Sequence, residues 1–303
     1  IRRQGVDKET IYTCYVTDKS RRLEGNVSVK DLLLDNKNSE IGDLMDENII
    51  FANTLDDREE VAEKFRKYDL MALPVVDKEN RLVGIVTVDD AIDVILEEAT
   101  EDIEKMAAIL PSEKSYFKTD VFSTFKSRIP WLLLLMISAT FTGAIISTFE
   151  AKLTAVPALI AFIPMLMDTA GNCGSQSSVT VIRSISLGDI EFKDIFRVVW
   201  KELRVAFLCS IVLMGVNYLK LMVVDNWILG NFNTEKQMLQ ILVVCLTQFF
   251  TVIVAKAVGC TLPILAKKLG FDPAVMASPF ITTIVDAISL MIYFGIAILL
   301  LKI

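Results

Sequence analysis

The stretch Pro164–Gln176 reads PMLMDTAGNCGSQ and places a carboxylate, amides, hydroxyls and glycines inside an otherwise apolar part of the chain. An unpaired polar group is costly in hydrocarbon, so polar and irregular backbone at membrane depth is tolerated where protein buries it or where it lines a water-filled cavity. We therefore expect this stretch to break a membrane helix and to line a path for a polar solute. The alternative is a packing seam of small residues between membrane helices.

The two halves of the chain differ in character. Mean hydropathy is +0.48 and 53% of the residues are hydrophobic, yet 23% are charged. Residues 1–128 carry 28 Asp and Glu against 19 Lys and Arg, a net charge of −9, whereas residues 129–303 carry 10 against 12, a net charge of +2. The pattern predicts an acidic soluble half followed by a membrane half. The acidic half disfavours nucleic acid as a partner and is compatible with cations.

Histidine is absent from the sequence, and the five cysteines show no metal-type pairing. The lack of histidine excludes histidine-based catalysis and disfavours a dedicated zinc or copper site. Oxygen ligands remain plentiful, and these are what a hard cation such as Mg²⁺ prefers.

An internal repeat occupies the soluble half, with Gly25 and Gly84 lying 59 positions apart. Residues 16–32 align with residues 75–91, and each copy predicts a strand, a polar turn, a second strand and a helix. We take residues 1–40 as a truncated first copy and residues 41–96 as a complete second copy. Because the first copy lacks its opening strand and helix, we expect the protein to extend further at its N-terminus.

The segments Leu73–Asp77 (LPVVD) and Gly84–Asp90 (GIVTVDD) resemble the signatures of a CBS pair. That resemblance implies a regulatory, non-catalytic module that binds adenine nucleotides or ions. ATP is then a candidate ligand, with Lys30 and Asp31 at positions that often contact phosphate and ribose in such modules. The alternative is that the pair only dimerises the protein.

An acidic helix is predicted from residue 89 to residue 104, where five carboxylates recur at steps of three or four. Like charges at this spacing destabilise a helix unless something neutralises them, so a cation at this face is a candidate and a solvated acidic face is the alternative. We assign residues 97–128 to an acidic connecting helix and an amphipathic linker, the latter from Phe117 to Arg128 near the lipid headgroups. The five carboxylates are Asp90, Asp93, Glu97, Glu101 and Glu104.

Five apolar segments in residues 129–303 are long enough to cross a bilayer. Basic residues gather between the second and third and between the fourth and fifth segments, which puts those loops and the soluble half in the cytoplasm and the C-terminus outside. The predicted fold is therefore an α+β cytosolic module followed by an all-α domain of five transmembrane helices, as expected of a multi-pass protein of the cell (inner) membrane. The segments are about 130–149, 155–184, 203–224, 238–266 and 274–301.

Among the charged residues within these segments, we single out three: Asp168, Lys256 and Asp286. Charged residues at membrane depth are usually functional. Asp286 has Thr282 one turn earlier on the same face, an oxygen-rich setting for hydrated Mg²⁺. In a dimer, two copies of Asp286 could meet at a central pore. We expect Lys256 to lie away from that path, paired with Asp168.

The order and spacing of these features resemble the MgtE family of magnesium channels along essentially the whole chain. The resemblance implies a homodimer in the lipid bilayer, a central Mg²⁺ pore, and a connecting helix that plugs the pore when cytoplasmic Mg²⁺ is high. It also implies an N-terminal helical domain that this sequence does not include. Asp286 resembles the pore carboxylate, Thr282 supplies a nearby backbone oxygen, and Gly171, Asn172 and Ser175 line the path.

The same resemblance implies a set of regulatory Mg²⁺ ligands on the soluble half and at the inner end of the fifth segment. The position of Asp168 also takes a small residue in this family, so its part in conduction is open. The implied sensor ligands are Asp57, Glu59, Asp69, Asp90, Asp93, Glu98, Glu101, Asp102 and Asp272.

Two other functions fit parts of this pattern. One is a carrier that exchanges Na⁺ for Mg²⁺ or for divalent cations more broadly. The other is an intramembrane aspartyl protease that uses Asp168 and Asp286 as a dyad. Neither aspartate lies in a Gly-x-Gly-Asp setting, and a protease does not need the acidic helix, so we expect a transport protein and not an enzyme.

Overall fold

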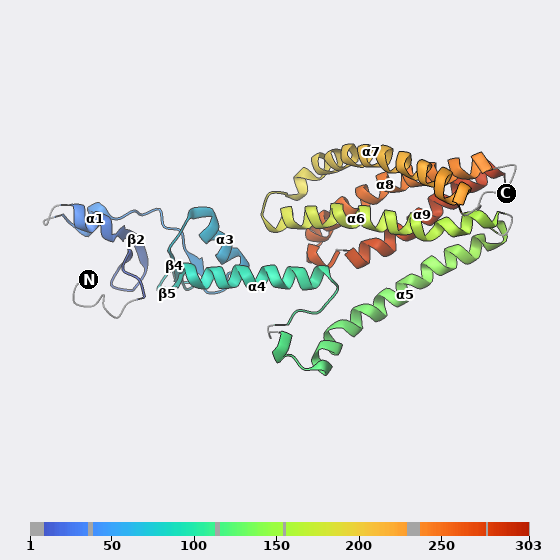
Figure 1. Cartoon of the computed structure of the whole chain (residues 1–303). Coiled ribbons are helices and arrows are strands. Elements are labelled where there is room, and N and C mark those ends of the chain that lie inside the picture. The colour runs from blue at the N-terminus through green and yellow to red at the C-terminus, as the bar shows by residue number, and fades with distance from the viewer. Residues whose placement is uncertain are drawn as a thin grey trace. The chain divides into compact units, whose positions relative to one another are not determined.

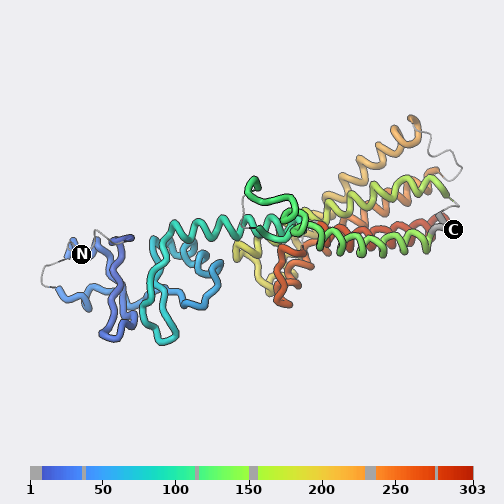
Figure 2. Tube along the Cα trace, turned by 90° about the horizontal axis from the view of Figure 1, so that it is seen from below, coloured from blue at the N-terminus to red at the C-terminus, as the bar shows by residue number. Residues whose placement is uncertain are grey.

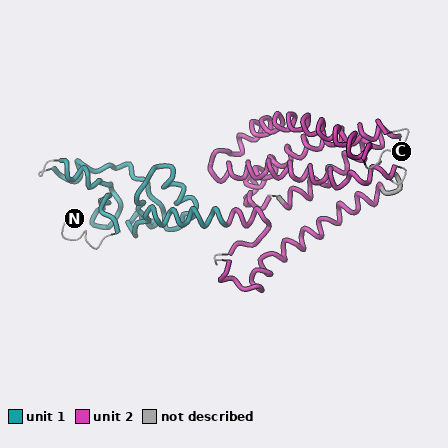
Figure 3. The backbone as a smooth tube through the Cα atoms, in the orientation of Figure 1, with its two compact units in different colours: residues 1–100 teal, residues 101–303 magenta. Residues whose placement is uncertain are grey.

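The computed structural model describes residues 9–35, 39–112, 116–153, 156–228, 237–276 and 278–302. It divides the chain into two compact units, residues 1–100 and residues 101–303 (Figure 3).

Two β-hairpins form the frame of the first unit. Strands β1 (Thr13–Thr17) and β2 (Leu23–Ser28) pair antiparallel, and strands β4 (Ala72–Val76) and β5 (Leu82–Thr87) do the same. Each register shifts at the same point, between residues 16 and 17 and between residues 75 and 76. The repeat at an offset of 59 is therefore confirmed down to the irregularity in its pairing.

The turns of the two hairpins bind to each other. The amide of Leu23 donates to the carbonyl of Asn80 at 3.0 Å, and the amide of Leu82 donates to the carbonyl of Arg21 at 2.8 Å. The hairpins consequently lie side by side (Figure 2). The short strand β3 (Ala52–Asn53) adds to β4 in parallel.

The helices of the first unit follow the predicted order. Helix α1 (Val29–Leu34) follows β2, and helix α4 (Val88–Met106) follows β5. Helices α2 (Ile41–Leu44) and α3 (Arg58–Tyr68) lie in the first part of the second copy, and α3 buries Ala62 and Phe65. Phe65 packs with Leu73 and Ala91 in the core of the unit, so burial of this apolar face holds α3 and α4 to the sheet.

The second unit contains five long helices in its described residues (Figure 1). Helices α6, α8 and α9 pack closely together, and α7 packs on α8. A 3₁₀ helix (Pro157–Phe162) leads into α6, and a π-helical stretch (Leu221–Ile228) extends α7. The five helices are α5 (Val121–Leu153), α6 (Ile163–Ser186), α7 (Ile195–Lys220), α8 (Gln237–Lys268) and α9 (Ser278–Leu301).

Four helical stretches among the described residues are long and apolar enough to cross a membrane: 121–149, 192–228, 237–268 and 273–301. Helix α6 does not join them, because its polar motif lowers its hydropathy. Its 24 residues nevertheless give a length of about 36 Å, sufficient to cross the hydrocarbon core. Eleven of its residues are buried, so protein rather than lipid surrounds much of it.

Two expectations about helix boundaries are wrong. The stretch Pro164–Gln176 does not break its helix, since α6 runs through it without interruption from Ile163. Helical hydrogen bonds satisfy the backbone there, and only side chains need polar partners. Residues 121–128 are likewise not a separate amphipathic linker, because α5 runs on from Val121 through Pro130 into the apolar segment.

Candidate ion-binding sites

Helices α6 and α9 approach closely at Gly171. A Cβ atom on Gly171 would lie 3.0 Å from Thr282 Cγ2 and 3.9 Å from Asp286 Oδ1. Any larger side chain would press on Thr282, so a small residue is what allows the two helices to meet here. The structure thus brings together three of the residues that the sequence assigned to the pathway.

The carboxylate of Asp286 is half-buried at this contact. Its neighbours on α9, Ile281 and Val285, are fully buried in the apolar core. Asp168 of α6 lies near enough for the two negative charges to repel each other. Such a pair of carboxylates favours a cation nearby. The hydroxyl of Thr282 donates to the Pro279 carbonyl at 2.9 Å, so its proton is used within α9.

One face of α6 carries exposed polar groups. Asp168 and Asn172 are both exposed and lie one turn apart, and the Asn172 amide donates to Asp168 at 3.2 Å. Ser175 follows at a half-buried position. A polar face that the single chain leaves uncovered within a membrane domain needs water or another protein surface beside it.

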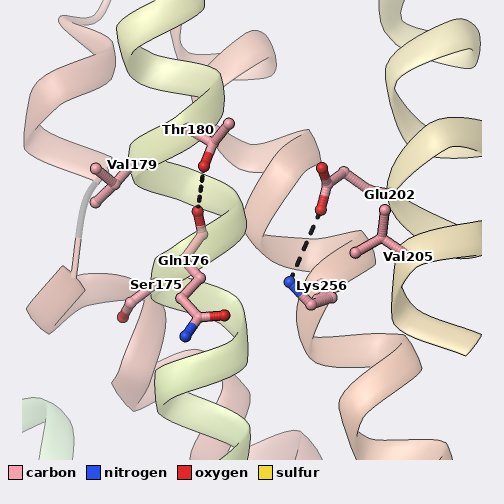
Figure 4. Close-up of a pocket in the computed structure, with 7 residues that line it drawn as sticks. All are labelled: Ser175, Gln176, Val179, Thr180, Glu202, Val205 and Lys256. Atoms are coloured by element: carbon pink, nitrogen blue, oxygen red, sulfur yellow. Dashed lines mark hydrogen bonds and ion pairs between the residues drawn. The ribbon is translucent and has the colours of Figure 1, made fainter. Parts of the chain in front are cut away.

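Lys256 does not pair with Asp168, contrary to the sequence-based expectation. Its ammonium on α8 lies 3.9 Å from Glu202 Oε2 of α7 and donates to Ser177 Oγ of α6 at 3.3 Å. The Ser177 hydroxyl in turn donates to Glu202 at 2.7 Å. Figure 4 shows Lys256 and Glu202 pointing toward each other. Glu202 lies just outside the predicted third segment, which explains why hydropathy alone missed it.

A second ion pair was also missed. Lys220 Nζ lies 3.0 Å from the buried carboxylate of Asp225, where the helix changes to π geometry. Both residues flank the predicted end of the third segment. Their opposite charges five positions apart were the available signal.

Four of the predicted sensor residues of the first unit, Asp57, Asp69, Asp90 and Glu98, have structural roles in this single chain. Asp57 caps the N-terminus of α3 by accepting from the Glu59 amide at 2.9 Å, and Asp69 ends that helix in a left-handed conformation. Asp90 accepts from the Thr87 hydroxyl at 2.7 Å, and Glu98 pairs with Arg58 at 2.8 Å. Asp93 is exposed on α4.

The remaining predicted sensor ligands lie in the second unit, and two of them, Glu101 and Asp272, bind the same lysine. Lys105 Nζ is 2.6 Å from Glu101 Oε1 and 2.6 Å from Asp272 Oδ2. Burial lowers the pKa of Lys105, but the hydrogen bonds to Asp272 and Glu101 raise it by more, so it stays charged. Asp102 accepts from the Ser186 hydroxyl at 3.1 Å, and burial raises the pKa of its carboxyl.

Met106 fixes the same end of α4 by packing against Ile182 and Ala274. Glu101 and Asp272 therefore share one cation, an ammonium, where a bridging Mg²⁺ was expected. Among the described residues, no group of three or more carboxylate or thiol side chains is close enough to hold a metal ion.

Lys30 and Asp31 lie at the start of α1, where both are exposed. Asp31 accepts from the Ser28 hydroxyl at 2.6 Å, and the Asp31 amide donates back to Ser28 at 3.1 Å. Ser28 and Asp31 thus make the same hydrogen bond as Thr87 and Asp90, which lie 59 positions later. Capping of a helix is thus a sufficient structural reason for both aspartates.

Comparison with known proteins identifies both parts of the chain. Residues 163–296 match the family model MgtE, described as a divalent cation transporter, and residues 41–97 match the CBS domain. The magnesium transporter MgtE of Thermus thermophilus is 37% identical over 302 residues, which is 100% of this chain and 65% of that protein. The chain belongs to the MgtE family.

The MgtE of Bacillus subtilis is 40% identical over 293 residues, covering 95% of this chain and 61% of that protein. The chain thus spans somewhat less than two thirds of the length of these relatives. They are named transporters, which agrees with the expectation of a protein that is not an enzyme.

Two solved structures are similar to about a third of the chain. The soluble part of a magnesium transporter is 44% identical, covers 32% of this chain and 38% of that chain, and has a TM-score of 0.32. The cytosolic domain of the Mg²⁺ channel MgtE in complex with ATP is 46% identical, covers 31% and 38%, and has a TM-score of 0.30.

Proposed function

We propose that this chain conducts Mg²⁺ across the membrane into the cytoplasm, with Asp286 as the carboxylate that attracts the ion. The observation that carries the proposal is the half-buried Asp286 on an apolar helix, next to Gly171 and within electrostatic reach of Asp168. Mg²⁺ gives up its water reluctantly, so one or two carboxylates would hold it with much of its hydration shell. The transporter relatives support this choice of ion.

The path runs along the exposed polar face of α6. Asn172 and Ser175 offer oxygens to the water around the ion, and Gly171 leaves room for it. Because one chain leaves this face uncovered, a second copy around a two-fold axis would enclose it and bring two copies of Asp286 to one pore. The membrane domain is thus the pore-forming part of a homodimer.

Cytoplasmic Mg²⁺ closes the path through the acidic residues of the first unit and of α4. Without Mg²⁺ these carboxylates repel one another, and bound ions would bridge them and favour the plugged state. The end of α4 suits this role, since Glu101, Asp102 and Asp272 gather there. Exposed Lys30 and Asp31 remain the candidate contacts for ATP.

The test is Mg²⁺ flux into liposomes that contain the full chain. Asp286→Ala should lower the flux about ten-fold or more, equivalent to at least about 1.4 kcal/mol of lost ion stabilisation. The matched control is Asp189→Ala, which removes an exposed carboxylate from the turn after α6. The flux of the unaltered protein should fall as Mg²⁺ on the side of the soluble unit rises.

Two outcomes would contradict the proposal. Equal flux through the Asp286→Ala and Asp189→Ala variants would remove Asp286 from the path. Flux that needs a Na⁺ gradient would favour the coupled exchanger over a channel.

A further inference from the structure

Three polar side chains from three helices form a buried cluster beside the proposed path. They are Lys256 of α8, Glu202 of α7 and Ser177 of α6, hereafter the Lys256 triad (Figure 4 shows its two charged members). Lys256 is 5% exposed and Ser177 is 1% exposed, while the Glu202 side chain is 13% exposed. The triad therefore lies inside the helix bundle and not on its surface.

Because the triad is buried, its charges are stable only in an arrangement that satisfies their hydrogen bonds. An ammonium or a carboxylate taken from water loses its hydration, and a nearby opposite charge offsets that loss only when hydrogen bonds complete the site. Here Ser177 completes the hydrogen bonding, because its oxygen accepts from Lys256 and its hydroxyl donates to Glu202. A rotation or sliding of α6 would carry Ser177 out of reach of both charges, so the triad resists that movement.

The same part of α6 is fixed a second time by glycine contacts. A Cβ atom on Gly259 of α8, three residues after Lys256, would overlap the carbonyl oxygen of Gly174 of α6, three residues before Ser177. The two contacts set the height and the rotation of α6 against α8. Gly171 lies only one turn before Gly174, so the placement of the path follows from them.

The triad also borders the polar face of α6. Lys256 and Glu202 line a cavity of about 650 Å³ together with Ser175 of the proposed path wall and its neighbour Gln176. Lys256 and Glu202 therefore lie next to the proposed path, but they interact with each other.

We propose that Lys256 is a positioning residue for ion conduction. Through Ser177 and Glu202 it holds α6 at the height and rotation that place Gly171, Asn172 and Ser175 opposite Asp286, and it thereby sets both the rate and the ion preference of the path. This inference rests on the proposed conduction between α6 and α9. It assigns Lys256 no contact with the ion.

The most informative variant is Ser177→Ala, which leaves the two charges in place and cuts only their link to α6. At equal amounts of folded protein in liposomes, it should lower Mg²⁺ flux about five-fold, which corresponds to a net loss of about 1 kcal/mol when the hydroxyl and its two hydrogen bonds are removed. The ratio of Mg²⁺ flux to Co²⁺ flux should change at least about two-fold. The matched control is Ser184→Ala on the same helix, whose hydroxyl donates only within α6, to the Thr180 carbonyl at 3.0 Å.

The double variant Lys256→Met with Glu202→Gln provides a second measurement, because removing both charges avoids leaving either one unpaired in the bundle. It should fold, keep a reduced flux and show the same changed ion preference as Ser177→Ala. If both variants have the flux and the Mg²⁺ to Co²⁺ ratio of the Ser184→Ala control per folded molecule, the triad only stabilises the bundle and the proposal is overturned.

Failure of the proposed path would be visible separately. If Asp286→Ala conducts normally, the path is wrong whatever the triad variants do. If Asp286→Ala stops the flux and Ser177→Ala leaves it unchanged, the path stands and the role of Lys256 falls.

Discussion

The contact between Gly174 and Gly259 determines how closely α6 and α8 pack, and Gly259→Ala tests it. The new methyl group would overlap a backbone carbonyl, which cannot rotate away as a side chain can, so the helices must separate. Overpacking of this kind costs about 1–3 kcal/mol, and alanine in a helix regains about 0.5–1 kcal/mol over glycine. Because the obstacle is backbone, we expect a net loss near the upper limit, about 2 kcal/mol.

Thermal unfolding in detergent measures this loss. At about 2–4 °C per kcal/mol for a unit of this size, Tm should fall by about 4–8 °C. Gly215→Ala on α7 is the matched control, since a Cβ there meets nothing within 4 Å and should leave Tm unchanged or slightly higher. If the two variants have the same Tm, the helices do not pack as closely as the structure has them, and the argument for α6 placement fails with it.

Two further predictions concern the end of α4. Lys105→Met leaves Glu101 and Asp272 without their shared cation. Mg²⁺ flux at low cytoplasmic Mg²⁺ should therefore rise, while closure at high Mg²⁺ persists. The control is Lys105→Arg, which keeps the charge, and equal flux through both variants at every Mg²⁺ concentration would contradict this prediction. The raised pKa of Asp102 means that the folded protein keeps the proton at a pH where the unfolded chain has released it, so stability should fall as pH rises from the ordinary value of 3.8 to the folded pKa. Asp102→Asn should flatten the Tm profile just above pH 3.8, and an unchanged slope would show that other groups cause it.

The repeat in the soluble half was predictable because its signals are local. Strand and turn residues recur at an offset of 59, and the same local pairing rules produced the same register and the same bulge twice. The Ser28 and Thr87 caps follow from the sequence for the same reason, since each hydroxyl reaches an aspartate three residues later.

Hydropathy was a poorer guide to the helix that matters most. Pro164–Gln176 was expected to break its segment because its side chains are polar, yet α6 is continuous there. A helix satisfies its own backbone whatever its side chains are, so polarity predicts what must surround a membrane helix and not whether it forms. The partners of Lys256 could not be predicted from local sequence, because Ser177 and Glu202 are 79 and 54 positions away on two other helices.

The sequence by itself determined the two-part organisation, the repeated hairpins, the apolar helices and the residues able to attract a cation, because composition, local spacing and charge suffice for these. Tertiary structure alone decided which of those residues meet. Gly171 lies close to Asp286 because a residue without a side chain lets α6 approach Thr282 of α9. Lys256 joins Glu202 and Ser177 instead of Asp168, and Lys105 lies between Glu101 and Asp272. Contacts between helices depend on how every interlocking side chain packs, and no single stretch of sequence holds that information.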